Sequence, residues 1–354
     1  MKRTKGRSIF ALMLAICLLL AACSSGSTGT SAPSSSAPAG SSAPAEQSSA
    51  PTASGDVLTL KLAHVLAPEH PYNLAANKFK EILEANAPTP VVVEVFPSGQ
   101  LGSERDITEG MQFGTVDIGI VPGTITLFEP KMGAISLPYI FDNAEHAYRV
   151  LDGEIGQELA ANLPGNGLRL LSYWENGFRS VTNNQRPITQ PDDLKGLKIR
   201  VPEDVVYQDA FNQFGANVTA MAFGELYTAL QQKTIDGQEN PLALIATNKI
   251  YEVQEYLSLT EHFYGPAQVL ISEERWQSLS PEMQAAVQDA MNQARDFERQ
   301  TLAENNASYL QTIIDSGTKV NEVDKSLFME DAQVVWDKYR GEYGDVIDKI
   351  RALA

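Results

Sequence analysis

The sequence predicts an α/β fold of two lobes that face a cleft. Beyond residue 56, short apolar runs alternate with amphipathic helical patterns in βαβαβ order. This part of the chain has roughly 300 residues, too many for one small domain and suited to two lobes. A helical stripe near the C-terminus covers about 34 residues, or ~50 Å at the α-helical rise. A helix of that length exceeds one small domain and could brace both lobes.

The first series of elements lies between residues 57 and 121. Alternating apolar residues predict strands in VLTLKLAHV, PVVVEVFP and VDIGIV. Amphipathic patterns predict helices in NLAANKFKEILEAN and SERDITEGMQFG, the second ending at Gly114. Strands that alternate with helices in this way favour a mainly parallel sheet with helices on its faces.

A second series follows without any internal sequence repeat. GLRLLSYW and LKGLKIRVP read as strands, and DVVYQDAFNQFG and FGELYTALQQ read as helices. Two α/β units in succession argue for two lobes, and clefts between α/β domains are common ligand sites.

The C-terminal quarter is mostly helical. Ser280 is a good N-cap and Pro281 suits the first helical turn, and an apolar stripe continues until Gly317. We expect one continuous helix there. The alternative is two helices with a break near Asn305 and Asn306.

Residues 1–22 have the features of a secretory signal peptide. Four basic residues precede the apolar run SIFALMLAICLLLAA, which is too short to span a bilayer as a stable helix. The small residues of LAAC resemble the lipobox of bacterial lipoproteins, which makes Cys23 the expected lipid-bearing residue. The alternative is ordinary cleavage near Ala22. Residues 23–56 are rich in Ser, Ala and Pro and predict a flexible linker that reaches ~30 Å.

Charge and cysteine content exclude several classes of protein. Loss of the four signal-peptide cations takes the formal charge from −17 to −21, which disfavours nucleic acid and anionic membrane surfaces. Cys17 lies in the signal peptide, so the exported chain has neither an intramolecular disulfide nor thiol catalysis. No later segment is apolar enough to cross a membrane. We therefore expect an extracytoplasmic protein held at the cell membrane by its lipid alone.

Motifs for catalysis and metal binding are missing. The sequence lacks G-x-S-x-G, H-E-x-x-H, P-loop and C-x-x-C patterns. His64 and His70 do not have metal-site spacing. We therefore expect no enzyme activity, no metal and no cofactor. An enzyme that uses only carboxylates has no sequence motif, so a motif search does not exclude it.

Several phrases between residues 173 and 247 share a family resemblance: NGFR, RPITQPDDLKGLKIRVP, MAFGELYTALQ and DGQENPL. FPSGQLGSERD, GTVDIGIV and SLPYIFDNAEHA add to it in the first lobe. Together they resemble the solute-binding proteins of tripartite ATP-independent periplasmic (TRAP) transporters, the DctP-type family, over residues 57–354. The resemblance implies a periplasmic-binding-protein-like fold with a long helix across both lobes. We expect the protein to be a monomer. Residues 57–177 plus 266–305 would form lobe I, and residues 178–265 plus 306–354 lobe II.

The resemblance also implies a function. Such proteins close over an organic acid, here a sugar acid such as a uronate or a C4-dicarboxylate, and pass it to a permease of one small and one large membrane subunit. Two other classes stay open at this point. One is a lipoprotein that reports its ligand to a signalling receptor, and the other is an exported enzyme.

Four ligand-binding residues follow from the same resemblance. Arg200, at the end of the KIRVP strand, would grip the ligand carboxylate, with Asn240 beside it and Arg179 supporting the same anion. Phe223 would pack on the body of the ligand. The chemistry agrees, because a guanidinium matches a carboxylate bidentately, an amide both donates and accepts, and a phenyl ring gives a rigid apolar wall.

Two positions depart from the family pattern. Glu203 stands where sialic-acid-binding members have asparagine; it could accept hydrogen bonds from sugar hydroxyls, pair with an ammonium group, or cap the helix that begins near Asp204. Pro122 stands near a position where some relatives have an acidic residue, and it offers no polar side chain. Further candidates for the lining have weaker support: Trp174, Glu175, His64, Glu104 and Tyr264.

Overall fold

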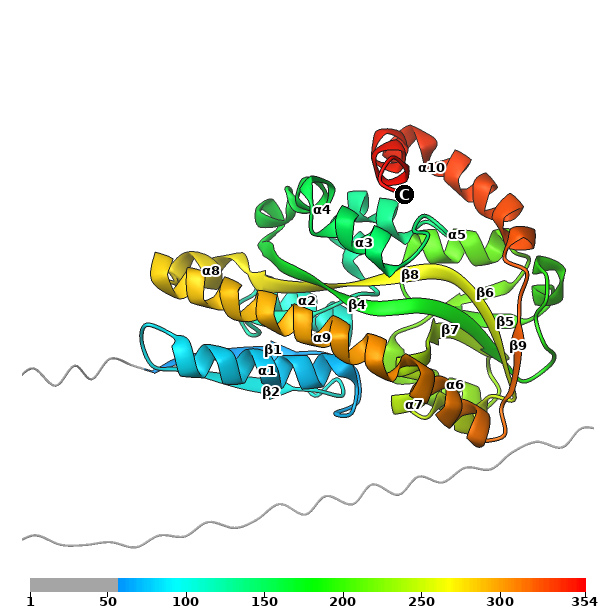
Figure 1. The fold of residues 1–354 in the computed structure, drawn as a ribbon, viewed down its shortest axis with the longest axis horizontal. Coiled ribbons are helices and arrows are strands. Elements are labelled where there is room, and N and C mark those ends of the chain that lie inside the picture. The colour runs from blue at the N-terminus through cyan, green and yellow to red at the C-terminus, as the bar shows by residue number, and fades with distance from the viewer. Residues whose placement is uncertain (1–56) are drawn as a thin grey trace, which may run out of the picture. The chain divides into compact units, whose positions relative to one another are not determined.

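The computed structural model describes residues 57–354, so the predicted signal peptide, Cys23 and the linker lie outside the described residues. A mixed sheet of nine strands runs through this part of the chain, in the order β2-β1-β3-β8-β4-β7-β5-β6, with β9 paired to β8 (Figure 1). The strands are β1 Leu58–Ala63, β2 Val91–Phe96, β3 Ile118–Ile120, β4 Leu168–Asn183, β5 Lys198–Val201, β6 Asn217–Ala220, β7 Gly237–Pro241, β8 Tyr256–Ser272 and β9 Lys319–Glu322.

Ten α-helices pack around the sheet in the described residues. They are α1 Pro71–Asn86, α2 Glu104–Gln112, α3 Ala144–Leu151, α4 Glu154–Ala160, α5 Val205–Gln213, α6 Phe223–Gln231, α7 Leu242–Thr247, α8 Glu273–Ser278, α9 Pro281–Asp315 and α10 Ser326–Arg351. None of the helices within residues 57–354 combines the length and hydropathy that a membrane span requires.

The sheet is parallel at both ends and antiparallel in the middle. At one end β1 pairs in parallel with β2 and β3, and at the other β5 pairs in parallel with β6 and β7. Between them the long strands β4 and β8 run antiparallel to each other and to β3 and β7. The α/β fold with two lobes is thus confirmed, but the mainly parallel sheet is wrong at its centre.

The lobes share β4 and β8 instead of being joined by loops. These strands have 16 and 17 residues, roughly three times the usual strand length. The predicted lobe boundaries fall inside them, where Gly177 lies opposite Gly265 in the register. Gly177 has φ of +101°, a conformation that disfavours any side chain. The boundaries themselves stay a prediction.

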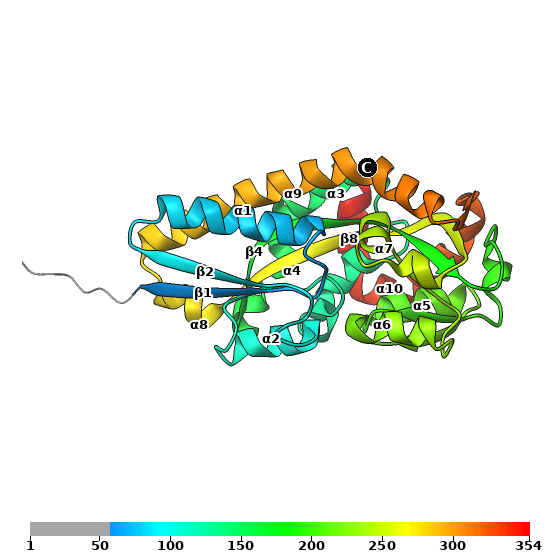
Figure 2. The ribbon, with the colours of Figure 1, turned by 90° about the horizontal axis from the view of Figure 1, so that it is seen from below.

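Helix α9 is continuous, so the alternative with a break near Asn305 and Asn306 is wrong. It has 35 residues, and the Ser280 hydroxyl caps its start by accepting from the Met283 N–H. One part of α9 packs on α1 and another on α7 (Figure 2). A single helix therefore contacts elements from both ends of the sheet.

Hydrophobic cores lie on both faces of the sheet. Tyr173 and Trp174 are neighbours in β4 and belong to different cores, as expected when successive side chains point to opposite faces. One core includes apolar residues of α1, α7 and α9, and the other includes those of α5 and α10. Core packing on both faces fixes the positions of β4 and β8. Residues of both strands line the pocket between the two ends of the sheet.

Candidate functional site

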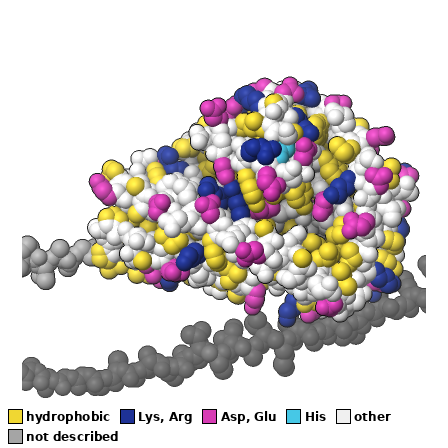
Figure 3. Space-filling view, in the orientation of Figure 1, with side chains coloured by type: hydrophobic (Ala, Val, Ile, Leu, Met, Phe, Trp, Pro, Cys, Tyr) yellow, Lys and Arg dark blue, Asp and Glu magenta, His cyan; other side chains and the backbone are white. Residues whose placement is uncertain are grey.

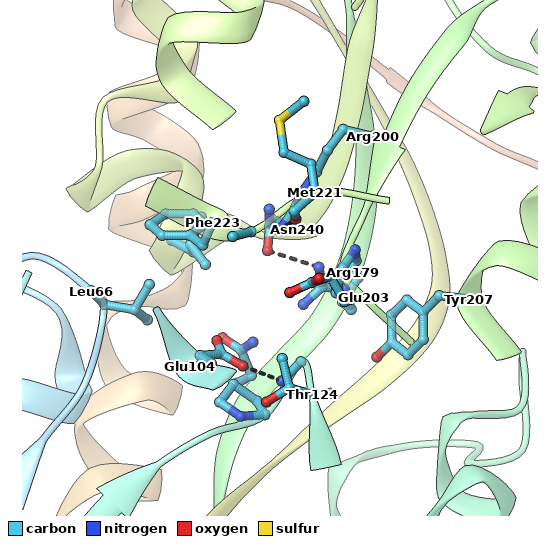
Figure 4. A pocket seen from close by; sticks show the side chains of 17 residues that line it. Leu66, Glu104, Thr124, Arg179, Arg200, Glu203, Tyr207, Met221, Phe223 and Asn240 are labelled. Carbon is cyan, nitrogen blue, oxygen red and sulfur yellow. Dashed lines mark hydrogen bonds between the residues drawn. The ribbon is translucent and has the colours of Figure 1, made fainter. Parts of the chain in front are cut away.

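A pocket lies between the two ends of the sheet, and side chains from both ends surround it (Figure 4). Six of the ten candidate residues from the sequence line it: Arg200, Asn240, Arg179, Phe223, Glu203 and Glu104. The full lining is Leu66, Glu104, Pro122, Gly123, Thr124, Asn176, Arg179, Arg200, Pro202, Glu203, Tyr207, Met221, Ala222, Phe223, Asn240, Leu244 and Gly265.

Arg200 is a buried cation, not a surface charge. It lies in β5, immediately before Val201 and Pro202 end the strand, and is 3% exposed. Its Nε and Nη2 donate to the carbonyl oxygen of Met221 at 2.9 and 2.6 Å. No carboxylate among the described residues forms a salt bridge with it, and its Nη1 has no hydrogen-bond partner there. Burial lowers the pKa of Arg200 to about 10, so it stays charged at neutral pH.

Arg179 is equally buried but already neutralised. Its Nε donates to Oε2 of Glu239 at 2.6 Å and its Nη2 to Oε1 at 2.8 Å, a bidentate pair. Burial acts to lower the pKa of Arg179, but the Glu239 carboxylate outweighs it and raises that pKa. His262 Nε2 lies 3.2 Å from Glu239 Oε2 and adds a third member to this network. The register of β4 with β7 brings Arg179 and Glu239 together.

Asn240 connects this network to the pocket. Its Oδ1 accepts from Arg179 Nη2 at 2.8 Å, and its Nδ2 donates to Oε1 of Gln238. An amide nitrogen has two hydrogens, so one donor of Asn240 remains for a ligand. Because both neighbours hold the amide, its orientation is set before any ligand arrives.

The acidic residues Glu104 and Glu203 also line the pocket. Glu104 begins α2, and its Oε2 accepts from the Gly123 N–H at 2.7 Å. Burial raises the pKa of Glu104 to about 7. Asp204, not Glu203, caps α5, since its Oδ1 accepts from the Val206 N–H at 2.7 Å. The cap role left open for Glu203 is therefore wrong, and Glu203 is a half-buried lining residue.

An apolar wall faces these charges. Phe223 at the start of α6, Met221 before it, Leu66 after β1 and Leu244 in α7 contribute to this wall. Pro122 also lines the pocket without a polar side chain. The wall can cover the carbon skeleton of a small molecule whose polar groups face the arginines and carboxylates.

His64 and Trp174 do not line this pocket, contrary to the expectation. They are 1% and 0% exposed. His64 Nδ1 accepts from the Leu66 N–H at 3.3 Å, and Trp174 packs edge-on against Tyr72. Burial lowers the pKa of His64 to about 4, so its ring is neutral at pH 7. Both support the segments behind the lining.

The two further candidates also lie elsewhere. Tyr264 is 2% exposed within the core, and Glu175 lines a separate cavity. His70 is a buried N-cap of α1, because its Nδ1 accepts from the Tyr72 N–H at 3.2 Å. The described residues form no cluster of His, Cys, Asp and Glu that could hold a metal ion.

Sequence reasoning missed Glu239 and Tyr207. Glu239 directly precedes Asn240 in DGQENPL. A charged residue next to a predicted ligand-binding residue, in a motif that carries the family resemblance, was the available signal for its role. Its role depends on pairing with Arg179, 60 residues away, which only the strand register reveals. Tyr207 looks like a core residue of α5, yet it lines the pocket and its ring lies 5.4 Å from the Arg179 guanidinium carbon.

Comparison with known proteins gives consistent matches. The model of bacterial extracellular solute-binding protein family 7, DctP, matches residues 62–342. The 2,3-diketo-L-gulonate-binding periplasmic protein YiaO of Escherichia coli is 34% identical over 281 residues, 79% of this chain and 86% of YiaO.

Solved structures of TRAP periplasmic solute-binding proteins are also similar. One from Polaromonas sp. JS666 bound to D-erythronate has a TM-score of 0.80 and 35% identity, covering 84% of this chain and 98% of that one. Another from Sulfurospirillum deleyianum with bound succinate has a TM-score of 0.80 and 32% identity, covering 84% and 99%.

Proposed function

The chain belongs to family 7 of the bacterial extracellular solute-binding proteins, the DctP family, and we propose that it captures an organic acid for a TRAP transporter. In this proposal, it delivers the acid to a permease of one small and one large membrane subunit. Its family and structural relatives are transport solute-binding proteins, not enzymes. The proposal therefore assigns it binding without turnover.

Arg200 is the observation that carries this proposal. A guanidinium that is 3% exposed, with one backbone acceptor and no carboxylate partner among the described residues, has lost its hydration without full compensation. A ligand carboxylate supplies the missing charge and accepts from Nη1. In a desolvated pocket such a pair is stronger than in water. We assign Arg200 as the carboxylate clamp, with Asn240 and Arg179 beside it.

The ligand we propose is a monocarboxylate that carries hydroxyl groups, such as an aldonate or a uronate. Glu239 neutralises Arg179, so Arg200 supplies the uncompensated positive charge of the lining. Glu203 would repel a second carboxylate, and both Glu203 and Glu104 could accept hydrogen bonds from hydroxyls. The diketogulonate and erythronate named for the relatives agree with this class, and the succinate structure supports a C4-dicarboxylate as the alternative. Phe223 would cover the carbon skeleton.

A thermal-shift screen of residues 24–354 against organic acids tests the function. At 100 times the dissociation constant a ligand adds about 2.7 kcal/mol of stability, an easily measured shift. We expect sugar acids to stabilise the protein and to be recovered unchanged. Consumption of the acid would identify an enzyme, and the lack of a shift with every organic acid would refute the proposed ligand class.

The membrane attachment is proposed separately, since Cys23 lies outside the described residues. We propose that Cys23 carries the lipid anchor and that the linker lets the folded part work near the membrane. Cys23→Ser should release the protein into the soluble fraction with its ligand affinity unchanged. Retention of the variant on the membrane after a salt wash would show another anchor.

A further inference from the structure

A second cavity, here called the rear cavity, has a volume of about 430 Å³. Phe178 and Ser180 of β4 line it, whereas Arg179 between them lines the ligand pocket. Asn176 of β4 lines both cavities, so the rear cavity adjoins the ligand pocket. The rear cavity is completed by α3, α7 and α9. Figure 3 shows this side of the molecule, where charged side chains gather over the region between α3 and α9.

The rear cavity is lined mainly by acidic side chains, whereas the ligand pocket contains the uncompensated positive charge of Arg200. Glu145, Glu175 and Glu261 are lining residues, and Arg299 is the single cation among them. Arg299 is already compensated, because its Nη1 and Nη2 donate to Asp152 at 2.6 and 3.0 Å. Lys325 pairs with Glu261, so Glu145 and Glu175 are the lining carboxylates without a cation partner among the described residues, and this negative charge favours a cationic ligand.

Glu175 marks where the cation would bind. It is 7% exposed, and the Tyr148 hydroxyl donates to its Oε2. Its Oε1 has no hydrogen-bond partner among the described residues. Arg299 does not satisfy it, since that guanidinium bonds to Asp152 and to the Tyr173 carbonyl and stacks 4.0 Å over the Tyr148 ring. A carboxylate oxygen that opens into a cavity of this size without a donor can accept a hydrogen bond from a ligand.

The other walls of the rear cavity are apolar. Phe178, Leu242 and Leu302 line it, and the volume lies within the range of small-molecule sites. We propose that the rear cavity is a binding site for a small organic cation. In this site a primary ammonium group donates to Glu175 Oε1 and an apolar body packs against Phe178, Leu242 and Leu302.

Benzylammonium is a suitable probe, and benzyl alcohol is its uncharged counterpart of the same shape. Calorimetric titration of residues 24–354 with each compound tests the site. We expect saturable millimolar binding of benzylammonium, and binding of benzyl alcohol at least tenfold weaker, because only the cation pairs with the carboxylate. Equal binding of both compounds, or no saturable binding of benzylammonium, would overturn the proposal.

Two variants locate the binding. Glu175→Gln keeps an acceptor for Tyr148 but removes the charge, and it should weaken benzylammonium at least tenfold. Ala303→Phe fills the cavity from the exposed side of α9 and should block the probe without loss of thermal stability. Glu330→Gln, an exposed carboxylate on α10, is the matched control and should bind like the parent. Unchanged affinity in both cavity variants would place the probe elsewhere and contradict the inference.

Discussion

The two arginines of the ligand pocket differ in what compensates their charge. Arg179 and Arg200 are each 3% exposed. At the β4–β7 pairing, Arg179 lies against Glu239, with His262 behind the carboxylate. At the end of β5, Arg200 meets only the Met221 carbonyl. The first region is electrostatically complete, and the second is not.

This difference separates a structural role from a binding role. A buried ion pair becomes strongly unfavourable when one partner is removed, because the other charge is left without compensation. A buried charge that has no ionic partner already costs stability, and the removal of Arg200 leaves a neutral carbonyl oxygen of Met221, not a charge, without its donor. We therefore expect substitutions at Arg179 to act first on the fold and substitutions at Arg200 to act on the ligand.

Loss of the Arg179–Glu239 ion pair should have the largest effect on stability. Arg179→Ala leaves Glu239 buried without a counter-charge and should lower the free energy of unfolding by ~3–5 kcal/mol. Urea unfolding of the empty protein measures this loss. The double variant Arg179→Met/Glu239→Leu should recover most of it, because it removes both charges. A loss below about 1 kcal/mol in the single variant would show that the pair does not hold the fold.

Arg200→Ala should act on binding instead. Removal of one partner of a desolvated charge pair costs ~2–5 kcal/mol, or roughly 30-fold to several thousand-fold in affinity. The empty variant should unfold at the same or a higher urea concentration than the parent. Arg200→Lys should restore only part of the affinity, since an ammonium lacks the bidentate fork.

Calorimetric titration against the best acid from the screen decides this prediction. If Arg200→Ala binds within about threefold of the parent, Arg200 is not the clamp.

Glu203→Gln tests the acidic side of the pocket. It removes a negative charge near the ligand and should improve succinate relative to a sugar acid by about fivefold, or ~1 kcal/mol. Competition titration of the two acids gives the ratio directly. Tight succinate binding by the parent, with no sugar acid bound at all, would contradict the charge argument before any variant is made.

Glu104 should give the smallest effect, visible in the pH dependence of stability. Its pKa rises from the ordinary 4.5 to about 7 in the folded protein. The folded protein therefore favours the protonated form of Glu104. Its folding stability falls as pH rises from about 4.5 to 7, and the loss is complete above pH 7. Glu104→Gln should remove it, on the order of 1 kcal/mol for a half-buried group.

The check is the melting temperature of parent and variant at pH 5 and pH 8. Their difference should grow toward pH 8. A constant difference would show that Glu104 titrates normally.

The sequence predicted the elements whose patterns are local. α9 and the strands β1 to β3 follow from caps and periodicity alone. β8 did not, because it is buried on both faces and carries polar residues such as His262 inside the sheet, so no alternation marks it. The same limit applies to the site. Motif resemblance indicated Arg200 and Asn240, whereas the Arg179–Glu239 pair depends on strand register, which periodicity cannot reveal.

The late position of β8 and α9 in the chain also sets an order of assembly. β3 has β1 on one side and needs β8 on the other, where Ile118 pairs with Ile271, and α1 packs on α9. The N-terminal end of the sheet is therefore incomplete until about 150 later residues have been synthesised. A chain truncated before Tyr256 would leave the edge of β3 exposed and prone to aggregation.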